Sequence, residues 1–139
     1  MASSVDQYYL HVSPADSKSI YSGNTANDFL VELPKSLDLS GEWECALYAA
    51  TLKAKRQKLA TSLTLTCDLM VESYCLGQMC QVLRYLNYRD FKGGRCLYSK
   101  PMYFDVLSDR AKLIRFGLKG LDLDPADEVA FSIHLRRKY

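Results

Sequence analysis

Hydrophobic and polar residues alternate along most of this chain with a period of two, which is the pattern of β-strands that bury one face. The alternation is clearest in residues 62–71, where Leu63, Leu65 and Cys67 are separated by threonines. The same pattern predicts further strands at residues 8–12, 29–33, 43–49, 77–86, 101–107, 112–118 and 129–137. Residues 52–60 are the one candidate helix, and they are equally compatible with a basic loop.

Stretches rich in Gly, Ser, Asn and Asp separate these eight strands and predict turns, as in SGNTAND and KGGR. Short antiparallel strands with one apolar face each bury those faces together in a sandwich or a barrel. We therefore expect an all-β protein, a single eight-stranded antiparallel sandwich over residues 1–139, with a jelly roll as the first choice. An immunoglobulin-like sandwich is the second choice, although the Cys…Trp…Cys order of that fold is missing, because Trp43 precedes Cys45.

Trp43 is the only tryptophan and lies in the third of the predicted strands. It shares its predicted face with Cys45 and Ala49, so we expect it to pack in the core rather than to bind a ligand. The strand before it is expected to end at Pro34, because proline has no N–H to donate to a ladder.

Composition narrows the range of partners. The net charge of +2 is too small to indicate nucleic-acid binding by bulk charge. Ten tyrosines suit half-buried strands and protein interfaces, because one end of the side chain is apolar and the other can hydrogen-bond. No apolar run approaches the roughly 20 residues of a membrane span, and residues 1–13 lack the apolar core of a signal peptide. We therefore expect synthesis in the cytosol and no membrane partner.

Little in the sequence indicates catalysis or metal binding. The five cysteines are odd in number and are expected to be free thiols, and Cys75 and Cys80 lack a second pair of zinc ligands. His11 and His134 lie on the polar faces of the first and last strands, and we expect them to face solvent or a partner. The common hydrolase, metalloprotease and nucleotide-binding motifs are missing. We therefore expect no enzyme, no catalytic residues, no metal and no cofactor.

Two basic clusters are candidates for contact with a partner. The first holds Lys53, Lys55, Arg56 and Lys58, and the second holds Arg136, Arg137 and Lys138. Each is compatible with solvated surface charge, or with contact to phosphate or to an acidic partner surface. No RNA-binding pattern of interleaved aromatic residues accompanies either cluster, so nucleic acid stays an alternative partner only.

Three blocks of the sequence together resemble a known family. NTANDFLVELPKSLDLSGEWECAL is similar to a pattern N-x-x-x-x-F-x-x-x-L-P-x-x-L-x-L-x-G-x-W-E-x-A-L, and CDLMVESYCLGQMCQVLRYL is similar to a C-D-[IL]-V…G…L-R block. VAFSIHLRRKY resembles the closing V-x-x-x-L-H-[FL]-R-R strand, with a slightly different ending at Ile133-His134-Leu135. The family consists of small capsid-associated proteins of Polinton (Maverick) elements and of related adintovirus- and adomavirus-like DNA viruses of animals. The resemblance covers about residues 8–139.

The resemblance implies a viral structural protein of the virion. Such elements encode a double jelly-roll major capsid protein and a smaller single jelly-roll protein at the vertices, so we expect a penton-like or minor capsid subunit. Its partners would be copies of itself, in a pentamer or alternatively a trimer, and the major capsid protein, with assembly in the host nucleus or cytoplasm. The chain departs from the pattern where the basic KAKRQK replaces a tyrosine-proline turn, and where it ends directly after the closing strand.

The contacts of a jelly-roll subunit are expected near the chain ends and the end loops. The candidate interface residues are Tyr8, Tyr9, Lys53, Lys55, Arg56, Lys58, Arg136, Arg137 and Tyr139, because Tyr and Arg are enriched at interface hot spots. Two other functions remain open at this point. One is a virion spike or attachment module that binds a receptor or glycan, and the other is a non-virion protein that binds nucleic acid or a host protein through the basic loop.

Overall fold

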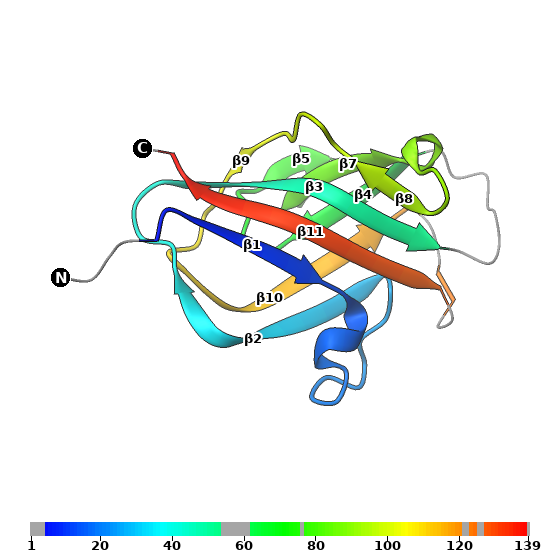
Figure 1. Ribbon diagram of the computed structural model, residues 1–139, viewed down its shortest axis with the longest axis horizontal. Coiled ribbons are helices and arrows are strands. Elements are labelled where there is room, and N and C mark those ends of the chain that lie inside the picture. Colours follow the sequence, from blue (N-terminus) through cyan, green and yellow to red (C-terminus); the bar gives the residue numbers. More distant parts are fainter. Residues whose placement is uncertain (1–4, 54–61, 76, 121–122, 125–126, 139) are drawn as a thin grey trace.

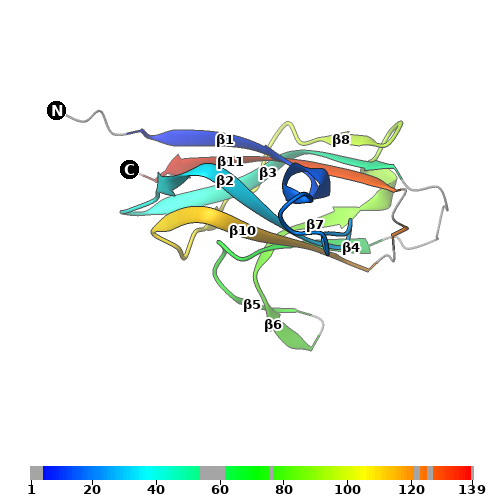
Figure 2. The ribbon, with the colours of Figure 1, turned by 90° about the horizontal axis from the view of Figure 1, so that it is seen from below.

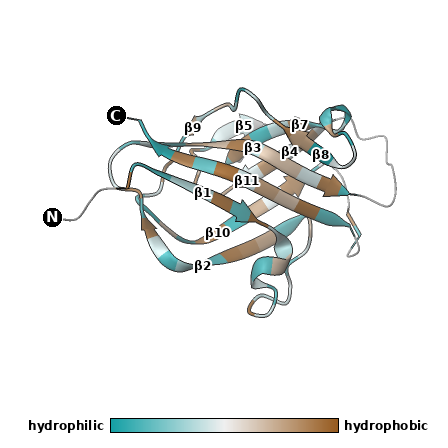
Figure 3. Ribbon diagram, viewed as in Figure 1, coloured by the Kyte–Doolittle hydropathy of each residue, from teal (hydrophilic) through white to brown (hydrophobic). Residues whose placement is uncertain are grey.

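The computed structural model describes residues 5–53, 62–75, 77–120, 123–124 and 127–138. These residues form two antiparallel β-sheets that pack face to face (Figure 1). The expectation of an all-β, antiparallel protein is therefore confirmed. Figure 3 shows how hydrophobic and hydrophilic residues alternate along strands such as β2 and β11, so that each sheet has one apolar face.

Each sheet is built around a ladder of four strands. Sheet A has the order β1 (Gln7–Val12), β11 (Glu128–Arg137), β3 (Trp43–Lys53) and β8 (Arg95–Leu97), and the two-residue β9 (Phe104–Asp105) also pairs with β3. Sheet B has the order β2 (Asp28–Asp38), β10 (Arg110–Lys119), β4 (Ser62–Cys67) and β7 (Val82–Asn87). A separate hairpin joins β5 (Ser73–Cys75) to β6 (Gln78–Cys80), and two short 3-10 helices are η1 (Pro14–Ser17) and η2 (Tyr88–Asp90).

The described residues form eleven strands, whereas the alternation predicts eight. The predicted strand 77–86 is split at Gln81, whose side-chain amide donates hydrogen bonds to the carbonyl oxygens of Asp68 (2.9 Å) and Met70 (2.8 Å). The strand predicted at 62–71 ends at Cys67 in a turn closed by the Met70 N–H. Strands β5 and β8 have only three residues each, too few for a period of two to be recognised.

The inner faces of the two sheets form the core. Phe29 of β2 stacks on Phe116 of β10 and on Phe131 of β11, with ring centroids 5.4 and 6.3 Å apart. Trp43 is 2% exposed, and its indole N–H donates to the carbonyl oxygen of Ser40 at 3.0 Å. The prediction that Trp43 is a core residue is confirmed. In the last strand the predicted inner residues, Val129 to Leu135 at every second position, are all buried.

A β-bulge in β3 corrects one predicted face. Ser132 of β11 pairs with Ala49 and the next residue pairs with Leu47, so Tyr48 is an extra residue opposite none. An extra residue shifts the alternation by one position. Beyond it Ala50 is buried and Ala49 is half-buried, so the prediction that Ala49 shares the core face of Trp43 is wrong.

Strand β2 continues past the proline that was expected to end it. It extends to Asp38, although its ladder with β10 is interrupted between Leu37 and Glu32. β2 is an edge strand of sheet B, and proline is tolerated there because its missing N–H can face away from the neighbouring strand. The prediction that Pro34 ends the strand is therefore wrong.

Candidate functional site

The outer face of sheet A carries both histidines of the chain, two tyrosines and several charged side chains. Cross-strand pairing places Tyr9 beside His134, His11 beside Ser132, and Thr51 beside Arg95. All of these residues alternate with buried ones along their strands, so their side chains point away from the core. We call this surface the A face, and it comprises Gln7, Tyr9, His11, Glu44, Tyr48, Thr51, Lys53, Arg95, Leu97, Glu128, Ala130, Ser132, His134 and Arg136.

His134 is the most deeply buried polar side chain on the A face. Its Nδ1 lies 2.7 Å from the Tyr103 hydroxyl, its Nε2 lies 2.9 Å from Gln7 Oε1, and the Tyr9 ring stacks on it at 4.4 Å. Because the Gln7 oxygen only accepts, Nε2 carries the proton and Nδ1 accepts from Tyr103. Burial and the positive charge of Arg136 lower the pKa of His134, which keeps the ring neutral. The prediction that His134 faces solvent or a partner is wrong, since only 9% of the residue is exposed.

His11 forms a looser contact on the same face. Its Nδ1 lies 2.7 Å from the Ser132 hydroxyl, and its Nε2 lies 3.4 Å from the Tyr48 hydroxyl. A serine activated by histidine needs a third group that orients the base, usually a carboxylate. Here the second ring nitrogen faces a phenol instead, on an open sheet surface. The arrangement fits a polar contact surface better than a nucleophilic site.

Arg136 is held at one end of the A face. Its Nε lies 2.6 Å from a Glu44 carboxylate oxygen, and its guanidinium lies 3.5 Å from the centre of the Tyr103 ring. Tyr9, by contrast, is 56% exposed although it stacks on His134. Of the predicted contact residues at this end, Tyr9 therefore offers the larger free surface.

Two other predicted contact residues, Tyr8 and Arg137, lie on the opposite side of their strands. The Tyr8 ring stacks on Trp43 at 5.5 Å, and the Arg137 guanidinium lies 5.1 Å from the Trp43 ring. Arg137 also donates to the carbonyl oxygen of Ser40 and lies 3.6 Å from Asp6. Both side chains therefore close the end of the core beside Trp43, and the structure does not bring them together with the A face.

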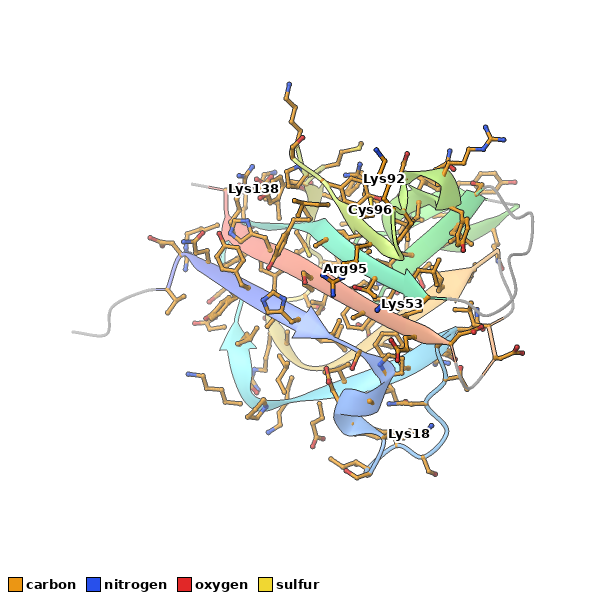
Figure 4. All side chains as sticks on the ribbon, turned by 45° about the vertical axis from the view of Figure 1, so that its right-hand side comes forward. Lys18, Lys53, Lys92, Arg95, Cys96 and Lys138 are labelled. Atoms are coloured by element: carbon orange, nitrogen blue, oxygen red, sulfur yellow. The ribbon has the colours of Figure 1, made fainter. Side chains whose placement is uncertain are left out.

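Lys53 marks the other end of the A face. It is exposed at the end of β3, and its stem packs over Gly94, where a Cβ would lie only 2.7 Å from the lysine Cγ. Figure 4 shows Lys53 close to Arg95 on this side of the molecule. Sequence analysis missed Arg95, because KGGR by itself indicates only a turn. The remaining predicted contact residues, Lys55, Arg56, Lys58 and Tyr139, lie outside the described residues.

A cleft of about 660 Å³ opens where the A face meets the loop around η1. Thr51 and Ala130 of sheet A form one side of it, and Pro14, Asn24 and Leu123 contribute to its walls. The Asn24 side chain is buried and bonds to both main-chain groups of Leu30, each at 2.9 Å. We call this hollow the η1 cleft, and this buried amide fixes its outer wall to sheet B.

Arg115 and Asp28 form an ion pair on the outer face of sheet B. Arg115 makes a two-pronged contact with Asp28, at 2.8 and 2.5 Å. Asp68 accepts the main-chain N–H of Arg115 at 3.2 Å, and burial raises the pKa of this carboxyl. Both charges of this pair are therefore balanced within the chain.

Four of the cysteines, Cys45, Cys67, Cys80 and Cys96, are buried. Cys45, Cys67 and Cys96 are free thiols, which confirms the prediction of free thiols for these three. Burial raises the pKa of Cys67 to about 12. Thiolate chemistry at neutral pH is therefore not favoured at this residue.

Comparisons with known proteins give no match to this chain, neither among the models of known protein families nor among the curated proteins. Within the described ranges, no helix is long and apolar enough to span a bilayer. A function for this chain is therefore inferred from its strand order, from the A face and from the three sequence blocks of the resemblance.

Proposed function

We propose that this protein is a capsid-building subunit, a single jelly roll that forms the vertex or a minor capsid component of a Polinton- or adintovirus-like virion. The strand order carries the proposal. Counting only the strands of the two four-stranded ladders in chain order, sheet A has the order 1-8-3-6 and sheet B the order 2-7-4-5. Each early strand thus pairs with a late one, as in a long hairpin rolled into two sheets.

That order supports a jelly roll with eight principal strands, an architecture used by viral capsid proteins, lectins and cupins. Among these, an interior ligand site is disfavoured here, because the space between the sheets is filled by Trp43, three phenylalanines and aliphatic residues. Both histidines lie on the outer A face instead. The functional groups are therefore on the surface, where a subunit contacts its neighbours.

Assembly would use exposed surfaces of this sandwich. Tyr9, Leu97 and Met102 are 56%, 79% and 54% exposed, and apolar or aromatic residues exposed in this way are typical of the core of an interface. A contact between unlike surfaces that repeats a fixed rotation closes into a ring. We expect a pentamer, with a trimer as the alternative, that is made in the host cytosol and joins the major capsid protein in the virion.

The proposal is tested with the purified full chain and the major capsid protein of the same element. Light scattering and electron microscopy are expected to show a discrete ring, and the ring is expected to bind the major capsid protein. A strict monomer at high concentration that also fails to bind the major capsid protein would overturn the proposal.

A virion attachment module is the second candidate, and the aromatic A face favours it. Tyr9 and Tyr48 meet edge to face at 5.9 Å beside the imidazole of His11. Exposed aromatic rings with nearby hydroxyls can stack on a sugar and hydrogen-bond to it. A glycan array probed with the wild type and with Tyr9→Ser tests this function. Binding that depends on Tyr9 supports it, and an array without signal rules it out for glycans.

A further inference from the structure

Strand β1 is an outer strand of sheet A, because within the described chain it pairs with β11 on one side only. Figure 2 shows the two sheets edge-on, with β1 in the same layer as β11. The pairing register is unbroken from Gln7 to Val12, so β1 forms a regular edge without a bulge. Outer strands present unpaired main-chain N–H and C=O groups, which can pair with another extended chain. The open side of β1 is therefore a candidate binding site.

The hydrogen-bond pattern identifies the residues that present these groups. The Arg137 N–H donates to the Asp6 carbonyl oxygen at 2.9 Å, and bonded and non-bonded pairs alternate along an antiparallel ladder. The even-numbered residues of β1 therefore bond to β11, and the odd-numbered residues turn their main-chain groups to the open side. These odd-numbered residues are Gln7, Tyr9 and His11. Across the described part of the chain, no other main-chain group bonds to theirs.

Two other outer strands have their open sides covered within the chain. On β2, the side-chain amide of Asn24 bonds to both main-chain groups of Leu30, each at 2.9 Å. On β8, the main-chain groups of Arg95 bond to those of Lys92 at 3.2 and 2.8 Å. Lysine and proline, which commonly protect an outer strand, are both missing from β1, whose sequence is QYYLHV. The open side of β1 is therefore left available to a partner.

The side chains of β1 determine what kind of segment fits beside it. On the A face, Tyr9 is 56% exposed and His11 is also exposed. On the opposite side of the strand, Tyr8 and Leu10 pack against the core and are only half-buried. No residue of β1 is an acid, a lysine or an arginine. An added strand would meet aromatic rings on one face and apolar surface on the other, which favours an uncharged segment with apolar residues at alternate positions.

We propose that the open side of β1 binds an extended segment of the major capsid protein, which adds to sheet A as a further strand. The main-chain groups of Gln7, Tyr9 and His11 supply the hydrogen bonds, and the side chains of β1 select the sequence. A second copy that added its own β1 would close a two-fold dimer, which does not grow into the expected ring. The inference rests on the proposed function and names the contact between this subunit and its capsid partner.

Hydrogen exchange at single residues tests strand addition, with the full chain and the major capsid protein of the same element. In the free chain, the main-chain N–H groups of Gln7, Tyr9 and His11 should exchange quickly. In the complex they should exchange at least about 100-fold more slowly, because a hydrogen-bonded N–H exchanges only when the structure opens. The N–H groups of Tyr8 and Leu10 bond to β11 and are the internal control, since they should be protected in both states.

A matched pair of substitutions at His11 provides a second test. His11→Pro removes an outward N–H and places its ring where the added strand would lie, whereas His11→Ala removes the same imidazole and keeps the N–H. Proline is tolerated on an outer strand when its nitrogen faces the open side, and melting temperatures confirm that both variants are folded. His11→Pro should bind the major capsid protein at least about tenfold more weakly than His11→Ala, because it loses a main-chain hydrogen bond and clashes with the added strand. Both variants should form the same ring as the wild type.

Three results would overturn the inference while the proposed function stands. The first is binding of the major capsid protein without slower exchange at the open side of β1, and the second is equal binding to both His11 variants. The third is exchange that slows as the concentration of the free chain rises, or a ring that is lost in His11→Pro, because either shows that a second copy occupies the strand. A monomeric chain that also fails to bind the major capsid protein would overturn both proposals.

Discussion

Tyr8 and Tyr9 are neighbours in β1 and belong to two regions with similar chemistry and different roles. Tyr8 points inward and stacks on Trp43, with Arg137 on the same indole. Tyr9 points outward and stacks on His134, where Arg136 instead covers Tyr103. Both regions combine aromatic rings with an arginine. The inner region seals the end of the core, whereas the outer region holds a loop against the sheet and leaves Tyr9 exposed.

Residue type alone therefore does not predict whether a side chain of this chain stabilises the core or is available for recognition. Tyr8 and Arg137 were expected at an interface because Tyr and Arg are common there, yet both are engaged at the core. The face of the strand decides the role, because alternate side chains point to opposite sides of a sheet. Substitutions that alter one region at a time therefore separate the two roles.

Trp43→Ala is expected to have the largest effect on stability, because it removes the buried indole on which Tyr8 and Arg137 pack. A fully buried aromatic truncated to alanine typically costs about 3–5 kcal/mol. The Ser40 carbonyl also loses one of its two side-chain donors, and Tyr8 loses the ring on which it stacks. The free energy of unfolding from urea titration measures the loss. A loss below about 1 kcal/mol would show that Trp43 is not part of the core.

His134→Ala should cost less, because it removes a polar anchor of the outer region rather than core volume. The Tyr103 hydroxyl and the Gln7 amide oxygen lose their partner. Because Tyr103 is half-buried and Gln7 is exposed, the expected cost is that of a typical hydrogen bond, about 0.5–1.5 kcal/mol each. Exchange of the Val106 main-chain N–H, which donates to the Trp43 carbonyl at 3.0 Å in the segment that follows Tyr103, should also speed up, as measured by hydrogen exchange. Unchanged exchange would show that the histidine does not hold the loop.

The same histidine should make the outer region sensitive to acid. Burial and Arg136 hold the pKa of His134 below its usual value, so the folded state prefers the neutral ring. This contribution to stability is complete above the unfolded pKa of about 6.5. It falls as the pH drops from there to the lower folded pKa, and then levels off. In urea titrations from pH 8 to pH 5, the stability difference between the wild type and His134→Gln should narrow. A stability difference that is the same at every pH would contradict a lowered pKa for His134.

Tyr9→Ser should have the smallest effect on stability and a visible effect on association. An exposed substitution usually changes stability by less than about 0.5 kcal/mol. Tyr8→Ser is the matched partner, and its greater cost is expected because the ring packs on Trp43. Melting temperature and sedimentation of both variants separate the two roles. If Tyr8→Ser and Tyr9→Ser destabilise the fold equally, the distinction between the regions fails.

Features that depend on local periodicity could be predicted from the sequence. The alternation of Val129, Phe131, Ile133 and Leu135 placed the inner face of the last strand correctly, and Trp43 was placed in the core. The bulge at Tyr48 was missed, because no glycine or other turn signal marks it. Its position depends on how β3 and β11 align across the sheet. A pattern within one strand does not contain that information.

The candidate functional site depends even more than the fold on contacts between residues that are far apart in the sequence. His134 is buried because Tyr9 and Gln7 of β1 and Tyr103, from another segment, cover it. Thr51 and Arg95 meet through the pairing of β3 with β8, and neither the η1 cleft nor the β5–β6 hairpin has a local signature. A useful signal existed in the apolar residues Tyr74 and Met79 on either side of a glycine. Sequence analysis placed them in or beside a longer strand instead of a separate hairpin.

Native mass spectrometry of the purified full chain tests the central claim, that this sandwich is a ring-forming capsid subunit, most directly. The account predicts a discrete species at five times the 15.8 kDa mass of the chain, with three copies as the alternative. A chain that remains monomeric at every concentration, or that stops at a dimer, would contradict ring formation.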